Sequence, residues 1–275
     1  MVLKRGNLTR FSLLIVGLFI LALSIVYSAG NAFPEGPDSI SVTNSSRQNP
    51  SSGSVTIQAE AGNVSSLKII NERATEAWQG YFGNVSGNIT LEDSSDNLFY
   101  SWDIANPTGE VYAVNRSAAP RWASVYCLNV SHSNADSHSD PLPFTRPDGS
   151  VSTINVSAVE LSYGINRTDR DGLNETFTSY WTGSFRTGAI TFDTTDNCAR
   201  ANPYSAGGAN GIWDEVILSD NDTLIFVSII EENQISFKAN SNLNDSVDFQ
   251  MLVLENGHVG LETTATNYFF YVELA

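Results

Sequence analysis

Residues 213–230, WDEVILSDNDTLIFVSII, decide the fold class. They hold two strand-like runs, 213–218 and 223–230, which flank the polar residues 219–222. Val, Ile and aromatic side chains recur in both runs and favour strands, whereas Ser, Asn and Asp favour a turn between them. The stretch therefore predicts two strands connected by a short turn.

The same pattern extends along most of the chain. Short apolar runs alternate with turn residues such as 94–97 (SSDN) and 106–109 (NPTG), and strands at spacings of roughly 8–12 residues favour an antiparallel sandwich. The sequence predicts an all-β fold, with an antiparallel β-sandwich-like ectodomain behind an N-terminal apolar helix. The other expected strands are 55–59, 67–70, 78–82, 87–91, 98–104, 110–114, 235–238, 247–254 and 268–274.

Two segments resemble each other: 77–97, AWQGYFGNVSGNITLEDSSDN, and 180–197, YWTGSFRTGAITFDTTDN. Each predicts a hairpin whose Trp, Trp78 or Trp181, anchors the core and whose Asp-Asn pair closes the next turn. Two interpretations stay open. The chain contains either two related β-units, about 67–133 and 150–275, or two hairpins of one sandwich with similar sequences.

Composition excludes some classes of protein. The 14 Lys and Arg against 30 Asp and Glu give a net charge of −16, which disfavours nucleic-acid binding because such binding depends on basic residues. Charged residues are only 16%, and polarity comes from 34 Ser, 20 Thr and 26 Asn. A length of 275 residues suits one large or two modest domains. This composition is typical of an exported, β-rich protein that carries carbohydrate.

The N-terminus predicts export. Three basic residues precede an apolar run at 11–27, FSLLIVGLFILALSIVY, which as a helix would span about 25 Å. Residues 1–32 therefore predict a signal peptide or a membrane anchor. If the segment is an anchor, residues 11–27 contact the membrane and the N-terminus stays in the cytoplasm. A third interpretation takes Arg5-Gly6 as a processing site like that of type IV pilin-like subunits.

Residues 33–54 are rich in Pro, Ser, Gly and Asn and predict a linker. The β-rich extracellular domain then covers 55–275. Twelve Asn-X-Ser/Thr sequons occur where chance would give roughly five, and all but Asn7 follow the apolar run. The sequence predicts glycosylation among these eleven: Asn44, Asn63, Asn84, Asn88, Asn115, Asn129, Asn155, Asn166, Asn174, Asn221 and Asn244.

The two cysteines, Cys127 and Cys198, fit the same compartment. Two cysteines in an extracellular chain most often form one disulfide. Closing a loop of about 70 residues would stabilise the fold by roughly 4 kcal/mol in the chain-entropy model.

Candidate sites for metals or catalysis are weak. His132, Asp136, His138 and Asp140 lie in a polar loop that we expect to be solvated, and Asp169, Asp171 and Glu175 lack EF-hand spacing. We expect no cofactor, although structural or adventitious calcium at that acidic turn is an alternative. Carboxyl pairs for glycoside hydrolysis would come from 213–215 or 231–232, both expected to flank strands. We expect no catalysis.

The runs 77–91 and 99–113, a later Cys, and the endings 248–251 and 269–274 resemble uncharacterised surface proteins of small-genome archaeal lineages. The resemblance covers roughly residues 67–275. The resemblance implies secretion, a β-rich ectodomain and pairing of Cys127 with Cys198. It supplies no known activity to carry over.

Together these observations predict a cell-surface or secreted glycoprotein with a structural or adhesive role. Its expected partners are the membrane and, beyond it, cell-envelope glycans or other surface proteins. One alternative is a secreted carbohydrate-active protein, either a sugar-binding module or a glycoside hydrolase. The other is a pilin-like filament subunit.

Overall fold

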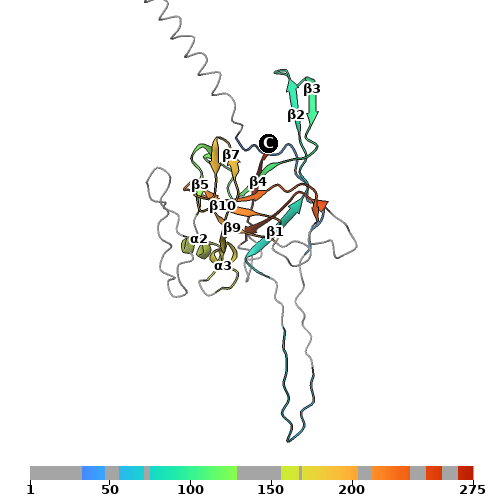
Figure 1. Cartoon of the computed structure of the whole chain (residues 1–275), viewed down its shortest axis with the longest axis vertical. Helices are drawn as coiled ribbons and strands as arrows, with labels where there is room; N and C mark the ends of the chain where they lie inside the picture. The colour runs from blue at the N-terminus through green and yellow to red at the C-terminus, as the bar shows by residue number, and fades with distance from the viewer. Residues whose placement is uncertain are drawn as a thin grey trace, which may run out of the picture.

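A seven-stranded antiparallel sheet forms the centre of the protein (Figure 1). The computed structural model describes residues 33–46, 56–70, 75–128, 156–166, 169–203, 212–235, 246–255 and 266–274. Six strands follow one another across the sheet. The seventh, β5 (Tyr126–Cys127), lies off this row and pairs with one of the six, β10 (Glu215–Ser219). In order they are β15 (Phe269–Leu274), β4 (Gly109–Val114), β11 (Leu224–Ile229), β10 (Glu215–Ser219), β9 (Ala199–Ala201) and β6 (Ser179–Tyr180). The all-β prediction is confirmed.

The three central strands β4, β11 and β10 are buried on both faces. Ala113, Ile217 and Phe226 belong to one apolar cluster, whereas their chain neighbours Tyr112 and Val216 belong to another. Because successive side chains of a strand point to opposite faces, each face of this sheet needs its own cover.

A two-stranded ribbon and two short helices cover the first face. Strand β1 (Trp78–Gly83) pairs with β14 (Phe249–Leu254), and the Trp78 ring meets Phe226 edge-on with centroids 6.3 Å apart. Helices α2 (Val156–Ser162) and α3 (Leu173–Thr176) lie beside this layer, and Leu173 joins its apolar cluster. The described residues therefore form one central sheet covered by a two-stranded ribbon. The predicted β-sandwich would instead have two facing sheets of similar size.

The hairpin of β7 (Phe185–Thr187) and β8 (Ile190–Phe192) covers the second face together with the 3₁₀ turn η1 (Trp122–Ser124). The Trp122 ring lies 5.2 Å from that of Tyr112, and Phe185 stacks on Phe192 at 5.0 Å. Trp181, Phe185 and Phe192 of the segment 180–197 therefore fill the second core, as the sequence predicts for Trp181.

Two extensions project from opposite ends of this body (Figure 1). One is the hairpin of β2 (Asn88–Glu92) and β3 (Leu98–Asp103), whose residues are almost all exposed. The other is residues 56–70, which are exposed throughout and belong to no strand. The predicted strands 55–59 and 67–70 are therefore wrong over the residues described, because no neighbouring strand pairs with them. A last short pair joins β12 (Gln234–Ile235) to β13 (Ser246–Val247).

The two similar segments do not form matching hairpins. In the second segment β7 pairs with β8, as predicted, but in the first β1 pairs with β14 and β2 pairs with β3. Strands from the proposed units 67–133 and 150–275 also alternate within one sheet, since β4 lies between β15 and β11. A common origin of the two segments stays a prediction.

The chain enters the body at residues 33–35, the start of the predicted linker. Glu35 exchanges two backbone hydrogen bonds with Val272 of β15, at 3.0 and 2.8 Å. The Phe33 ring packs over Gly188, where a Cβ would lie 2.6 Å from Phe33 Cδ1. The linker therefore begins docked against the body. The predicted apolar helix lies outside the described residues, and within them no helix is long and apolar enough to span a membrane.

Replacing Gly109 with alanine should destabilise the fold. Gly109 has φ +121°, and a Cβ there would lie 2.0 Å from the carbonyl oxygen of Glu273 in the paired strand β15. We expect a loss of at least about 1 kcal/mol in the free energy of unfolding, measured in urea. Gly80→Ala is the matched strand control, because a Cβ at Gly80 meets nothing within 4 Å. Equal losses in both variants would contradict this account of β4.

Candidate functional site

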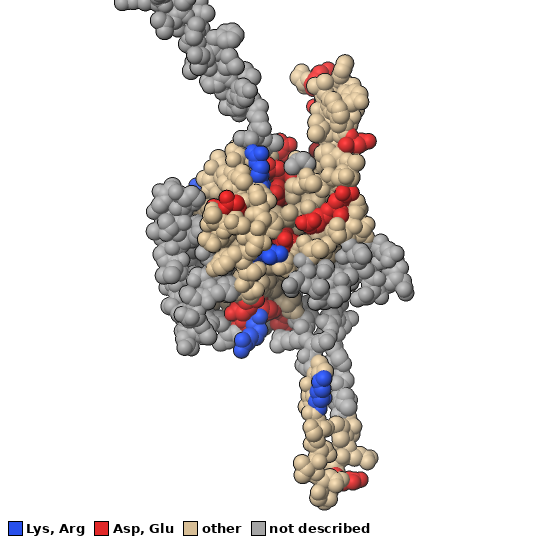
Figure 2. All heavy atoms as spheres, viewed as in Figure 1, with Lys and Arg blue, Asp and Glu red and all other residues tan. Residues whose placement is uncertain are grey.

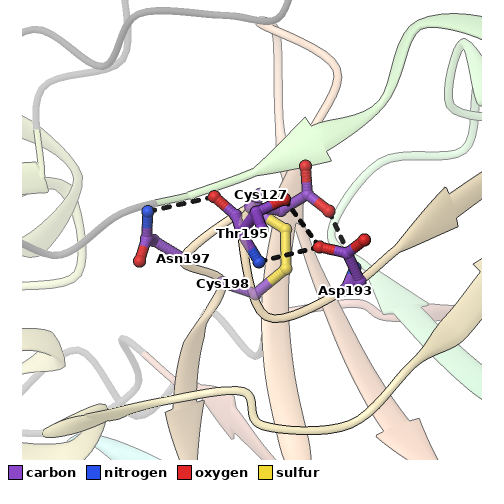
Figure 3. The surroundings of a disulfide bond; sticks show 6 residues. Cys127, Asp193, Thr195, Asn197 and Cys198 are labelled. Atoms are coloured by element: carbon purple, nitrogen blue, oxygen red, sulfur yellow. Dashed lines mark hydrogen bonds between the residues drawn. A yellow bond between two sulfur atoms is a disulfide. The ribbon is translucent and has the colours of Figure 1, made fainter.

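The disulfide between Cys127 and Cys198 lies in the second core (Figure 3), with the two Cα atoms 4.6 Å apart at a sequence separation of 71. Strands β5 and β9 share one edge of β10: Cys127 pairs with Leu218, and Arg200 pairs with Val216. The disulfide joins these two very short strands where one ends and the next begins. The predicted pairing is confirmed.

An aspartate turn leads into Cys198 (Figure 3). Asp193 Oδ1 accepts hydrogen bonds from the backbone N–H and the hydroxyl of Thr195, both at 2.7 Å. These bonds hold the pKa of Asp193 below its usual range. In the first similar segment, Asp93 accepts the corresponding bond from the Ser95 N–H and a further bond from the Asn97 side chain, and its pKa is also lowered. The resemblance of the two segments is thus partly a shared turn chemistry.

Eight of the eleven predicted glycosylation sites lie within the described residues, and none of these eight is buried. Asn44, Asn63, Asn84, Asn88, Asn115 and Asn166 are exposed, and Asn174 and Asn221 are half-buried. Asn88 lies in β2 on the face opposite Ile89, as predicted, although Ile89 is itself exposed. Asn129, Asn155 and Asn244 lie outside the described residues. Glycosylation itself stays a prediction.

Two of these asparagines are held by the body through their side chains. Asn115 Nδ2 donates to the Tyr163 hydroxyl at 2.5 Å, and its Oδ1 accepts from Thr223 Oγ1 at 3.1 Å. Asn221 Oδ1 accepts a hydrogen bond from the Tyr126 hydroxyl at 2.8 Å. Both side chains therefore connect loops to the sheet.

Carboxyl groups attach the β7–β8 hairpin to the second face. Glu110 of β4 accepts the Arg186 N–H at 3.3 Å, and Glu273 of β15 accepts the Gly188 N–H at 2.8 Å and the Tyr112 hydroxyl at 3.2 Å. Burial raises the pKa of Glu110 to about 8; the Arg186 N–H opposes the rise and the charge of Glu273 adds to it. Glu110 is therefore mostly neutral below that pH.

The carboxyls that the sequence offered for hydrolysis have structural partners. Glu215 is fully buried in the first face, where its Oε2 accepts the Leu252 N–H at 2.8 Å, and burial raises its pKa well above the ordinary value. Asp214 forms an ion pair with Arg200. The pKa of Glu231 is raised by partial burial and by the charge of Asp214.

The described residues contain no group of three or more His, Cys, Asp or Glu that could hold a metal. At the acidic turn, Asp169 accepts the Asn166 N–H at 2.7 Å and Asp171 accepts the Thr75 hydroxyl. The loop with His132, Asp136, His138 and Asp140 lies outside the described residues. Calcium binding stays an alternative without support from this turn.

Sequence reasoning missed the most exposed apolar surface on the sheet elements. Ile89, Leu91, Tyr100 and Trp102 share one face of the β2–β3 hairpin, and each is half exposed or more. The rings of Tyr100 and Trp102 lie 4.6 Å apart. Apolar alternation favours a strand but does not say whether another layer covers it, so the pattern gave no signal for this exposure.

No protein-family model, no curated protein and no solved structure matches the chain. The resemblance to archaeal surface proteins therefore stays a prediction.

Replacing Cys127 with serine should lower the free energy of unfolding by a few kcal/mol, because the denatured chain then regains the freedom of a long open loop. Urea unfolding measures the loss, and Cys198 should become reactive to an alkylating reagent. The Cys127→Ser/Cys198→Ser double variant separates loss of the bridge from effects of a lone thiol. Full alkylation of both cysteines in the native oxidised protein would contradict the bridge.

Glu110→Gln should flatten the pH dependence of stability. The folded state keeps the Glu110 proton from its ordinary pKa of 4.5 up to about 8, whereas the unfolded state releases it. The free energy of unfolding therefore falls as pH rises through this window. Gln mimics the neutral acid, so urea unfolding between pH 5 and 8 should show a smaller decline in the variant. Parallel wild-type and variant curves would count against a raised pKa.

Proposed function

We propose that the chain is a cell-surface or secreted glycoprotein whose β-rich ectodomain has a structural or adhesive role and performs no catalysis. The observation that carries the proposal is the placement of the sequons. None of the eight described sequon asparagines is buried, whereas both disulfide cysteines are. A bulky glycan is compatible only with the first kind of position.

The oxidised cysteine pair supports the same compartment. Disulfides persist in oxidising surroundings and are rare in the cytosol. Phe33 and Glu35 already contact the body, so few residues separate the body from the segment 11–27. If that segment is a membrane anchor, it would hold the body close to the membrane. The interpretations of 1–32 as anchor, cleaved signal or pilin-like segment all remain proposals.

The carboxyl groups give hydrolysis no support. A glycosidase needs two carboxyls about 5–9.5 Å apart on either side of an accessible sugar bond. Glu110 and Glu273 are cross-strand neighbours, but both accept backbone N–H groups of the hairpin that covers them. A substrate would have to displace that hairpin.

Sugar binding is the second candidate, because Tyr100 and Trp102 form an exposed aromatic pair. Aromatic rings offer flat apolar surface with a polar edge, which suits a sugar face. The same hairpin also carries two unpaired strand edges within the described chain. A sugar would leave those edges unused, so the observations favour a protein partner there.

The glycan proposal makes a site-specific prediction. Among exposed sequons, we expect Asn44 and Asn84 to carry glycan in the native protein and Asn115 to carry little or none, because the Asn115 amide is bonded at both ends. Glycopeptide mass spectrometry of protein isolated from the cell envelope measures the occupancy of each site. Unmodified peptides at every sequon, or absence of the protein from the envelope and the medium, would overturn the proposal.

A further inference from the structure

In the part of the chain that the structure describes, no further strand pairs with either extension of the body. We call residues 56–70 the arm, and we call Ile89, Leu91, Tyr100 and Trp102 the hairpin face. We infer that the arm of one chain adds to the β2–β3 hairpin of a second copy, so that copies join head to tail. The inference deepens the proposed structural role, on which it rests, by naming the partner.

The arm has a strand-forming sequence, but it pairs with no strand among the described residues. Ile57, Val64, Leu67, Ile69 and Ile70 are each more than half exposed. The arm belongs to none of the sheets formed by the described residues, and its tip is closed by the bond from Asn63 N to Glu60 O at 3.3 Å. A segment rich in β-branched residues gains most by adding to an open sheet edge.

The hairpin offers such an edge. It consists of two strands alone, and a hairpin of two strands is marginally stable in water without further cover. Its outer N–H and C=O groups form a template for another strand. The strands have five and six residues, and the returning half of the arm, 64–70, is long enough to pair along either.

Side chains also match across this contact. The hairpin face is apolar, whereas the opposite face carries Asn88, Thr90, Ser101 and Asp103 beside one exposed aromatic residue, Phe99. A strand added beside β2 or β3 would place Leu67 and Ile69 on the same side, next to the apolar face. Glycan at Asn88 would leave the hairpin face free, because Asn88 points to the other side.

Charge selects the arm over a second hairpin. Residues 88–103 contain the acids Glu92, Asp93, Asp96 and Asp103 and no Lys or Arg, whereas the arm contains Glu60 and Lys68 and is neutral. Two hairpins placed together would bring like charges close, which disfavours symmetric pairing. An arm on a hairpin adds no net charge.

The positions of the two extensions dictate the kind of assembly. Figures 1 and 2 show the hairpin and the arm at opposite ends of the long axis of the molecule. An arm at one end therefore meets a hairpin between copies, and each joined copy still presents one free arm and one free hairpin. A heterologous contact of this kind builds rings or open filaments.

The size of the contact predicts its strength. Each extension is a short segment, so a single contact should bury less than the roughly 800 Å² that each partner buries in a standard interface. Single contacts should therefore be weak, and assembly should depend on protein concentration.

A complementation experiment tests this directly. The full chain is held in detergent micelles, so that residues 11–27 are covered equally in every variant, and its protein mass is followed by sedimentation over a range of concentrations. Ile69→Asp disables the arm and Trp102→Thr disables the hairpin face while keeping a strand-forming residue. Ile40→Asp is the control, because Ile40 is exposed but lies in neither extension.

We expect the wild type and Ile40→Asp to associate as concentration rises, and each of the other variants to associate about tenfold or more weakly. Mixing Ile69→Asp with Trp102→Thr should restore association but stop at heterodimers, because each chain keeps one working extension. Unchanged urea midpoints would show that the variants fold.

Other outcomes overturn the inference. Association of Ile69→Asp as strong as the wild type would indicate hairpin-to-hairpin contact, and the same result for Trp102→Thr would indicate arm-to-arm contact. A wild type that stays monomeric but binds an envelope polysaccharide through Trp102 would assign the hairpin face to sugar. None of these results bears on glycosylation or location, so the proposed function is tested separately.

Discussion

Burial of both faces of β4, β11 and β10 is the constraint on which the rest of the structure depends. A central sheet of this kind needs a layer on each side, and each layer is attached through a buried polar group as well as apolar side chains. On the first face Glu215 accepts a backbone N–H of β14, and on the second Glu110 accepts one of the β7–β8 hairpin. These contacts fix the position of each covering layer on the sheet. A carboxyl group costs less free energy to bury when it is neutral than when it is charged.

The sequence predicts the central strands because their apolar runs are long and bounded by turn residues. The strands 110–114 and 223–230 appear in the structure as β4 and β11, and the disulfide is expected from the presence of two cysteines in a chain predicted to be exported. Pairing could not be predicted, since alternation in β1 says nothing about its distant partner β14. The prediction of a strand at 67–70 is wrong for the same reason, because a β-strand needs a neighbouring strand to pair with. Exposure of Trp102 likewise depends on which layers reach it.

The body and its two extensions differ in how far their apolar side chains are covered. The disulfide and the two covered faces make a rigid unit. Its surface carries acidic side chains (Figure 2), which together with the proposed glycans would suit the outside of a cell. The arm and the hairpin carry most of the large apolar side chains that are exposed among the described residues. A structural surface protein needs this combination, because a rigid body sets the spacing of an assembly and open strands connect its units. The docked entry at Glu35 would hold such an assembly close to a membrane.

Hydrogen exchange of the backbone amides, followed by mass spectrometry at low and high protein concentration, tests this difference most directly. The account predicts that peptides from β4, β10 and β11 are equally protected at both concentrations. It predicts that peptides from 56–70 and 88–103 exchange fast in dilute protein and slow together as copies associate. Fast exchange of both extensions at every concentration, or slow exchange of the hairpin in dilute protein, would contradict it.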